Sequence, residues 1–392
     1  MSIIVQKYGG TSVGSVERMR HVADLVIAER NVGHQVVVVA SAMAGATNHL
    51  VNSAQQFNNA VGTPAYDFVI STGENVSCGL LALALSEKGV NAIPIAGWQV
   101  PIKTNELHSK ARIIDIETPY LHQLLDSGIV PVITGFQGMG ADQRLTTLGR
   151  GGSDTSAVAI AAALKAKRCD IYTDIDGIYT ADPRVVADAR FIPDMAYDVA
   201  FQMATLGTKI IHPRAVECGM RSNVPLRILS SFGSDKFTTL SGSHPTESNV
   251  TGIAHTQNTV LYNVSTPNLG VGDNIINVLH DLDIPLDMVI KSNDGLQFCA
   301  EFSDDSIIRD ILNSYSVPQT KVSCAKISAV GCVAKDYLSH VLRMLNAQNI
   351  TVIYSCVDNM RMSILVSKHE MEMAVNTLHT FFFNLNTKKV DF

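Results

Sequence analysis

Cysteine pairs are missing from this sequence of 392 residues. Its seven cysteines are scattered and odd in number, and no two of them form a Cys-x-x-Cys motif. This pattern argues against a disulfide framework and against a zinc site, and it favours reduced thiols in a cytosol. The start of the chain lacks the charged and long apolar regions of a signal peptide, and no apolar run reaches the roughly 18–20 residues of a membrane span. We therefore expect a soluble, cytoplasmic protein.

Positive charge is also scarce. Lys plus Arg total 30 against 36 Asp plus Glu, which gives a net charge of -6. The chain therefore has no general attraction for nucleic acid or for an anionic membrane, and local groups must bind any anionic ligand. Aromatic residues make up 6%, charged residues 17% and apolar residues 46%, a balance typical of a compact α/β enzyme. The length predicts two to three domains.

Short apolar runs alternate with segments of helical period over residues 1–230. The runs have the length and composition of buried central strands, and they lie at 3–5, 36–40, 92–96, 129–134, 169–173 and 226–229. The alternation predicts a mostly parallel sheet covered by helices on both sides. Such sheets bind ligands at the carboxyl ends of their strands, so the loops that directly follow strands are the candidate site.

The composition changes near residues 230–250, which are rich in Ser, Thr and Gly and show no sustained period. This change marks a domain boundary. Beyond it, two βαββ-type units of about 65 residues each form an internal repeat. Paired small α+β modules are more typical of sensing or assembly than of catalysis.

The first predicted strand runs into a Gly-rich segment, residues 7–12, with the sequence KYGGTS. Two glycines let the backbone turn sharply and bring N–H groups close to a ligand, and a helix N-terminus just beyond would favour an anion. Lys7 would add a mobile positive charge. This motif alone predicts a phosphate cradle no more strongly than an ordinary turn with a solvated Lys7.

A second Gly-rich segment, TTLGRGGSDTS, covers residues 146–156 and precedes an Ala-rich helix. It is not a Walker A loop, because no Lys follows the glycines, and Asp154 stands where a dinucleotide fingerprint has its third glycine. Arg150 can present its planar fork to a carboxylate or phosphate, and Ser153 could cap the helix. The alternative is a capped helix beside an exposed arginine.

A third segment, residues 172–184, follows a strand and combines acidic side chains with a tyrosine and an arginine. Its sequence, YTDIDGIYTADPR, suits nucleotide hydroxyls, a ring face and phosphates, but alone it also fits an acidic surface loop. Downstream, Lys209 is a second candidate phosphate ligand. Taken singly, Glu74 at a helix start and His212 before a helix are more typical of structural residues.

Six motifs follow one another along the chain: KYGGTS, SAMAGAT, STGEN, TTLGRGGSDTSA, YTDIDGIYTADPR and LGTKIIHPRAVE. In this order and spacing they strongly resemble the aspartate kinases (aspartokinases) of the amino acid kinase superfamily. The C-terminal repeat resembles the paired ACT domains of that family, so the resemblance spans nearly the whole chain. It implies an αβα sandwich with an eight-stranded, mostly parallel sheet, and two ferredoxin-like α+β ACT domains.

The resemblance also implies domain boundaries and site residues. The catalytic domain would cover 1–235, a linker 236–250, the first ACT domain 258–323, and the second ACT domain 251–257 with 324–392. The implied catalytic residues are Lys7, Asp154 and Lys209. Those that would hold aspartate are Ser41, Thr47, Glu74, Arg150, Gly152 and Ser153. Those that would hold ATP are Lys7, Gly9, Gly10, Thr11, Thr173, Asp174, Tyr179, Asp182, Arg184 and Lys209. No residue is assigned to a metal.

The implied reaction is phosphoryl transfer from ATP, with Mg²⁺, to the side-chain carboxylate of L-aspartate, the first step toward lysine, threonine, methionine and isoleucine. The implied assembly is a homodimer through the ACT domains. Two alternatives remain: another amino acid kinase acting on glutamate, N-acetylglutamate or a nucleoside monophosphate, and a catalytically inactive amino-acid sensor. The paired ACT units argue against the first, and the intact Lys7, Arg150, Asp154 and Lys209 against the second.

The regulatory part departs from the family pattern. A D-x-P-G turn and an I-N-V-D-M strand are usual in the first ACT unit, whereas this chain has PNLG at 267–270 and IPLDM at 284–288. The second unit has AKDY at 334–337 in place of its glycine turn, and SCVDN at 355–359 in place of S-T-S-E. We expect weak or absent inhibition by lysine and threonine; the competing interpretation is a site altered for another effector.

Overall fold

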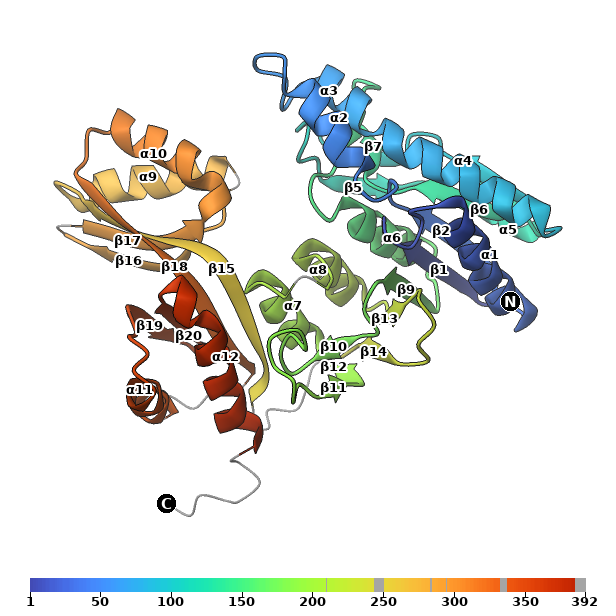
Figure 1. Ribbon diagram of the computed structural model, residues 1–392. Coiled ribbons are helices and arrows are strands. Elements are labelled where there is room, and N and C mark those ends of the chain that lie inside the picture. Colours follow the sequence, from blue (N-terminus) through green and yellow to red (C-terminus); the bar gives the residue numbers. More distant parts are fainter. Residues whose placement is uncertain (209, 243–249, 283, 294, 332–336, 385–392) are drawn as a thin grey trace. The chain divides into compact units, whose positions relative to one another are not determined.

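The computed structural model describes residues 1–392 except 209, 243–249, 283, 294, 332–336 and 385–392 (Figure 1). The chain divides into two compact units. Unit 1 comprises Met1–Ile178, Phe191–Thr205 and Lys209–Pro245, and unit 2 comprises Tyr179–Arg190, Leu206–Thr208 and Thr246–Phe392. The second unit thus takes two short segments from the region that the sequence assigned to the catalytic domain.

Unit 1 is built on an eight-stranded sheet with the order β12-β14-β13-β9-β1-β2-β6-β3. Six strands are parallel: β1 (Ile3–Tyr8), β2 (Gln35–Ala40), β3 (Ala92–Ile95), β6 (Val130–Thr134), β9 (Arg168–Thr173) and β13 (Leu226–Ser230). β14 (Phe237–Leu240) runs antiparallel to β13, and β12 (Asp194–Met195) pairs with β14. The predicted mostly parallel, eight-stranded sheet is confirmed. β14 brings residues of the expected linker into this sheet.

The central strands are buried because helices cover the sheet. All five residues of β6, VPVIT, are buried, as are five of the six in β2, QVVVVA. Burial on both faces selects such continuous β-branched runs. Helix α1 (Val16–Asn31), which Ser15 caps, and helix α4 (Thr72–Glu87) share one apolar core with β1, β2 and β6. Helix α6 (Gly152–Ala163) packs against β1 and β9.

The remaining elements of unit 1 surround this sheet. A four-stranded sheet has the order β5-β4-β7-β8, with β4 (Ile102–Thr104), β5 (Ile113–Ile116), β7 (Gln137–Met139) and β8 (Leu145–Thr147). The helices are α2 (Ala46–Ala54), α3 (Pro64–Ile70), α5 (Pro119–Asp126), α7 (Tyr197–Thr205) and α8 (Pro213–Ser222). Together α3 and α4 are long and apolar enough to cross a membrane, but most of the apolar stretch is buried, as in the core helix of a globular protein.

Unit 2 contains one antiparallel six-stranded sheet with the order β16-β17-β15-β18-β20-β19. Its long strands, β15 (Val250–Ser265) and β18 (Gln319–Gly331), pair with each other through both halves of the sheet. The other strands are β16 (Asp287–Ser292), β17 (Gly295–Glu301), β19 (Tyr354–Val357) and β20 (Arg361–Val366). The helices are α9 (Leu269–Asp281), α10 (Asp305–Ser314), α11 (Tyr337–Ala347) and α12 (Met371–His379). One apolar core lies under α9 and α10, and another under α11 and α12.

The segment Tyr179–Arg190 is part of the second of these cores. Ala181 and Val186 are buried with side chains of β18, β20, α11 and α12. The carbonyl of Thr180 accepts a hydrogen bond from Ile253 N at 2.7 Å, and Thr180 Oγ1 lies 2.8 Å from Nε2 of the buried His379. Strand β10 (Ile178–Tyr179) leads into this segment, and β11 (Phe191–Ile192) follows it.

Candidate active site

Lys7 and Asp154 form the charged centre of the predicted site. Lys7 lies near the carboxyl end of β1, and Asp154 lies in the first turn of α6. Their side chains, both largely buried, form an ion pair with Nζ and Oδ1 2.6 Å apart. Because burial weakens the screening by water, this pair holds the ammonium group in one position at the end of the sheet.

The glycine loop after β1 differs from the expected phosphate cradle in one respect. Helix α1 begins only at Val16, so its N-terminus is separated from the glycines by a further turn. Gly9 N already donates to Tyr172 O at 3.2 Å, whereas the N–H groups of Gly10 and Thr11 donate to no described residue. A Cβ on Gly10 would lie 2.9 Å from the Ala42 carbonyl oxygen, so only glycine fits where the loops after β1 and β2 meet.

The second glycine loop brings Arg150 to the surface of unit 1. Gly151 has a φ of 65° and starts helix α6 without a side-chain cap, so the expected capping role of Ser153 is wrong. Ser153 instead lies inside the first turn, against Gly135 after β6, where a Cβ would be 2.7 Å from Ser153 Cβ. Arg150 is exposed and makes no hydrogen bond or ion pair with a described residue. Its guanidinium is therefore available to an anion.

His212 packs against this loop. A Cβ on Gly151 would lie 2.1 Å from His212 Cγ, so glycine is required there for a second reason. His212 Nδ1 accepts from Arg214 N at 3.3 Å and caps helix α8. Burial is the main reason that the pKa of His212 is lowered; the charge of Asp154 opposes this shift, and the charges of Arg214 and Arg150 add to it. The imidazole is therefore neutral near pH 7 and acts as a structural cap.

Glu74 is a buried carboxylate in the first turn of α4. Its Oε1 accepts from Ala42 N at 3.1 Å, but its buried Oε2 has no hydrogen-bond partner among the described residues. Burial raises the pKa of Glu74 to about 7, against its usual 4.5. A buried oxygen without a partner costs free energy, so this carboxylate is suited to a cation brought by a ligand.

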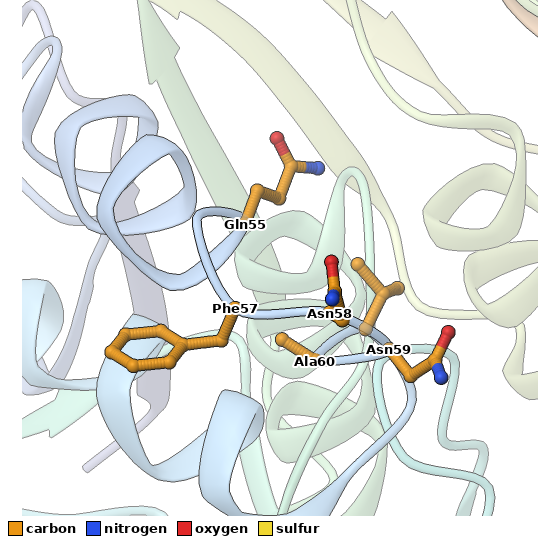
Figure 2. A pocket seen from close by; sticks show the side chains of 6 residues that line it. Gln55, Phe57, Asn58, Asn59 and Ala60 are labelled. Carbon is orange, nitrogen blue, oxygen red and sulfur yellow. The ribbon is translucent and has the colours of Figure 1, made fainter.

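Two hollows lie beside helix α2, one near its start and one beyond its end. One, largely apolar, is bordered by Met43, Ala46 and Gly73. Ala46 directly precedes Thr47 in the chain, and Gly73 directly precedes Glu74. Ser41, which directly follows β2, is half-buried, and its carbonyl accepts from Ser77 Oγ at 2.6 Å. The other hollow lies in the loop between α2 and α3, where Phe57 points away from Asn58 and Asn59 (Figure 2). This second hollow contains none of the predicted site residues.

The predicted nucleotide residues fall into two groups. Thr173 ends β9, and its hydroxyl donates to the exposed Asp174 at 3.0 Å in unit 1. Tyr179, Asp182 and Arg184 belong to unit 2, where Arg184 Nη2 lies 2.7 Å from Asp182 Oδ2. The hydrogen bonds from Arg184 are the main reason that the pKa of Asp182 lies below its usual value. The predicted residue Lys209 lies outside the described residues.

Sequence reasoning missed three polar residues next to these loops: Arg18, Ser231 and Asp67. Arg18 donates to Ser231 Oγ at 3.0 Å, and Ser231 Oγ donates to Ser12 Oγ at 2.7 Å. Asp67 on α3 is completely buried and accepts from the backbone N–H of Thr147 at 2.9 Å. A charged residue among apolar neighbours, as in the sequence PAYDFVI, was the available signal for Asp67.

Metal ligands do not gather in the described part of the chain: no group of three or more His, Cys, Asp or Glu side chains could hold an ion. Mg²⁺ commonly binds through one or two carboxylates, several waters and the phosphates of a nucleotide, which does not require such a group. Asp154 and Asp174 are carboxylates of the kind that this arrangement needs.

Comparisons with known proteins identify the relatives of this chain. A sequence profile of the Amino acid kinase family matches residues 2–230. Aspartokinase 2 of Bacillus subtilis (strain 168) is 38% identical over 400 aligned positions, which cover 97% of this chain and 98% of that protein. The crystal structure of E. coli aspartokinase III with aspartate and ADP (R-state) has a TM-score of 0.85 at 26% identity, covering 97% of this chain and 100% of the other. The same enzyme with lysine and aspartate (T-state) has a TM-score of 0.77 at 26% identity, covering 97% and 99%.

Proposed function

Because this chain belongs to the amino acid kinase family, and to the aspartokinases within it, we propose that it phosphorylates L-aspartate around Lys7, Glu74 and Arg150. It is an ATP-dependent kinase that acts on aspartate. The observation that carries the assignment of the site is the buried Lys7–Asp154 ion pair at the carboxyl end of the sheet. It supplies a fixed cation in the region where parallel sheets bind their ligands.

The three charges of aspartate are matched by three groups of unit 1. Arg150 presents a planar fork that binds a carboxylate through two parallel hydrogen bonds, and it binds the α-carboxylate. Glu74 is ionised when the α-ammonium of the substrate approaches its unpartnered oxygen. Ser41, Thr47, Gly152 and Ser153 complete the site with hydroxyl and backbone groups. The side-chain carboxylate is then directed toward Lys7.

ATP is bound by the loops of unit 1 that follow β1 and β9. The amides of Gly10 and Thr11 face the phosphates, since they donate to no described residue. Thr173 and Asp174 bind the nucleoside and its phosphates, and Lys209 assists Lys7; the nucleotide roles of Tyr179, Asp182 and Arg184, which belong to unit 2, stay predictions from the sequence. Mg²⁺ would be held mainly by the phosphates, with Asp154 and Asp174 as candidate carboxylate ligands, and would neutralise charge on the phosphates.

The chemistry needs positioning and charge neutralisation. A side-chain carboxylate oxygen of aspartate attacks the γ-phosphorus, the bond from that phosphorus to the β,γ-bridging oxygen breaks, and ADP leaves with that electron pair. Because the attacking carboxylate is already ionised at neutral pH, no general base is needed. Lys7 acts on the transferring phosphoryl group, whose charge changes most in the transition state, and Asp154 holds Lys7 in place.

A direct assay tests this assignment. The purified chain with Mg·ATP and L-aspartate should form 4-phospho-L-aspartate, which hydroxylamine traps as the hydroxamate. L-Glutamate, N-acetylglutamate and a reaction without substrate serve as controls. Equal turnover with L-glutamate would refute the substrate, and a chain that forms no hydroxamate with any of them would support the alternative of an amino-acid sensor.

The biological setting follows from the same assignment. We propose a cytoplasmic enzyme at the entry to the lysine, threonine, methionine and isoleucine pathway. A homodimer through unit 2 is supported by the edge strands β16 and β19, each of which pairs with a single described strand. An unpaired edge is available to a second copy of the sheet.

A further inference from the structure

Asp67 is the most heavily hydrogen-bonded carboxylate of unit 1, although it lies outside the motifs assigned above. It is completely buried on helix α3. Oδ2 accepts from Thr147 N at 2.9 Å, and Oδ1 accepts from Thr147 Oγ1 at 2.7 Å. Ser109 N donates to both oxygens at 3.0 Å, and Ser109 Oγ donates to Oδ1 at 3.2 Å. His108 Nδ1 lies 2.9 Å from Oδ2.

These contacts join three segments that are distant in sequence. Asp67 lies on α3, Ser109 lies in the loop between β4 and β5, and Thr147 is the last residue of β8. The chain then reaches Arg150 within three residues. A Cβ on Gly149 would lie 2.8 Å from the Ser109 carbonyl oxygen, so the loop that carries Arg150 rests directly on the residue that Asp67 holds.

A second set of contacts holds the same loop from helix α8. Arg214 Nη1 donates to Leu148 O at 2.7 Å, and Nη2 donates to Ala111 O at 3.0 Å. The backbone between Thr147 and Arg150 is therefore fixed on the Asp67 side by a carboxylate and on the other by a guanidinium. Burying a carboxylate carries a desolvation penalty, and apolar side chains of equal volume would stabilise the fold without that penalty. Buried hydrogen-bonded groups of this kind are typical of sites whose backbone must be placed accurately.

We propose that Asp67 is a positioning residue for aspartate binding, which acts by holding the backbone from which Arg150 reaches the substrate. The proposal rests on the assignment of Arg150 to the substrate carboxylate. Two parallel hydrogen bonds tolerate little displacement, and an error of about 1 Å in a binding group can cost up to about 100-fold. Asp67 does not touch the substrate itself.

The test compares Asp67→Asn with the control Asp142→Asn. Asparagine has nearly the same shape, but its amide nitrogen cannot accept the donors that Asp67 binds. Asp142 lies exposed in the turn between β7 and β8, where it accepts from Arg144 N at 3.0 Å. We expect Asp67→Asn to raise the KM for aspartate about 10-fold or more and the KM for ATP less than about 2-fold. Asp142→Asn should change neither.

A double-mutant cycle with Arg150→Lys separates positioning from general destabilisation. If Asp67 acts through Arg150, Asp67→Asn should add less than about 2-fold to the aspartate KM once Arg150 is changed, because neighbours that share one function are not additive. If the effects multiply, the proposal is wrong. Should Asp67→Asn fail to fold, Thr147→Val, which removes one donor and keeps the shape, takes its place with an expected rise of about 3- to 10-fold.

The outcomes distinguish this inference from the proposed function. A wild-type enzyme that does not phosphorylate aspartate, or an Arg150→Lys variant with an unchanged aspartate KM, overturns the assignment of the site. If Arg150→Lys raises the aspartate KM while folded Asp67→Asn and Thr147→Val leave it unchanged, only the role of Asp67 is overturned.

Discussion

Glu74 should make aspartate binding depend on pH near neutrality. Burial raises the pKa of Glu74 to about 7 in the free enzyme. The substrate ammonium pairs only with the ionised carboxylate, so binding stabilises the charged form and lowers this pKa. At pH 6 about 10% of the free enzyme is ionised at Glu74, and at pH 8 about 90%, by the ordinary titration curve. The KM for aspartate should therefore rise about 10-fold from pH 8 to pH 6.

Glu74 should also make the stability of the free enzyme depend on pH: a rise in pH that strengthens aspartate binding should lower the free energy of unfolding. In the unfolded chain Glu74 titrates near 4.5 and in the folded chain near 7, so the folded chain binds more protons between these values. Stability therefore falls as the pH rises through this window. The rise from 4.5 to about 7 corresponds to a loss of up to about 3 kcal/mol once the pH exceeds 7.

Calorimetry of aspartate binding measures this linkage directly. At pH 7 wild-type enzyme should release about half a proton per aspartate bound, obtained from the binding heat in buffers of different ionisation enthalpy, and at pH 8.5 nearly none. Glu74→Gln should remove the pH dependence of stability between pH 5 and 8 that belongs to this residue, in unfolding experiments without ligand. An aspartate KM that is constant from pH 6 to pH 8, with no proton release at pH 7, would refute the reasoning.

The other predictions concern the phosphoryl site, the substrate carboxylate and regulation. Lys7→Ala should lower kcat about 100-fold or more with small changes in either KM, because the charge of Lys7 acts mainly in the transition state. The control Lys88→Ala, which breaks an exposed ion pair with Asp24, should leave kcat unchanged. An unchanged kcat in Lys7→Ala would remove Lys7 from the mechanism. Arg150→Lys, which loses the planar fork, should raise the aspartate KM about 10-fold and leave ATP binding intact, and loss of ATP binding alone would reverse the assignment of the two glycine loops. Millimolar lysine and threonine, singly or together, should inhibit the enzyme weakly or not at all. In the PNLG turn, the side chain of Asn268 already accepts a hydrogen bond from Val271 N and caps α9, so it is not available to an effector. Strong inhibition by either amino acid would contradict this prediction.

The spacing of apolar residues predicted most of the strands and helices, because a buried strand or helix face requires apolar residues at regular positions in the local sequence. The runs of β2 and β6 are continuous and β-branched, and the structure buries them in the middle of the sheet. Helix α10 was missed even though Ile308 and Leu312 are spaced one helical turn apart and both are buried. The two glycines before α1 do not by themselves say how many residues of turn precede Ser15, the N-cap of that helix.

The site was harder to derive because its groups meet only in three dimensions. The motifs identified Lys7 and Asp154 separately, but no local pattern predicts that these residues, 147 positions apart in the sequence, form an ion pair. Ser153 had the right chemistry for a cap, yet the N-cap is Gly151, at a position where His212 leaves no room for a Cβ. Asp67 depends on partners in β8 and in a loop that pattern analysis treats as independent segments.

The packing of Tyr179–Arg190 within unit 2 bears on how this enzyme can evolve by domain exchange. Ala181 and Val186 complete the apolar core beneath α11 and α12, and Thr180 bonds to strand β15 and contacts His379. A gene fusion that swapped everything after residue 245 for another regulatory module would strip these residues of the partners with which they fold. An exchanged regulatory module would therefore have to bring its own partners for Tyr179–Arg190, or bring its own version of this segment.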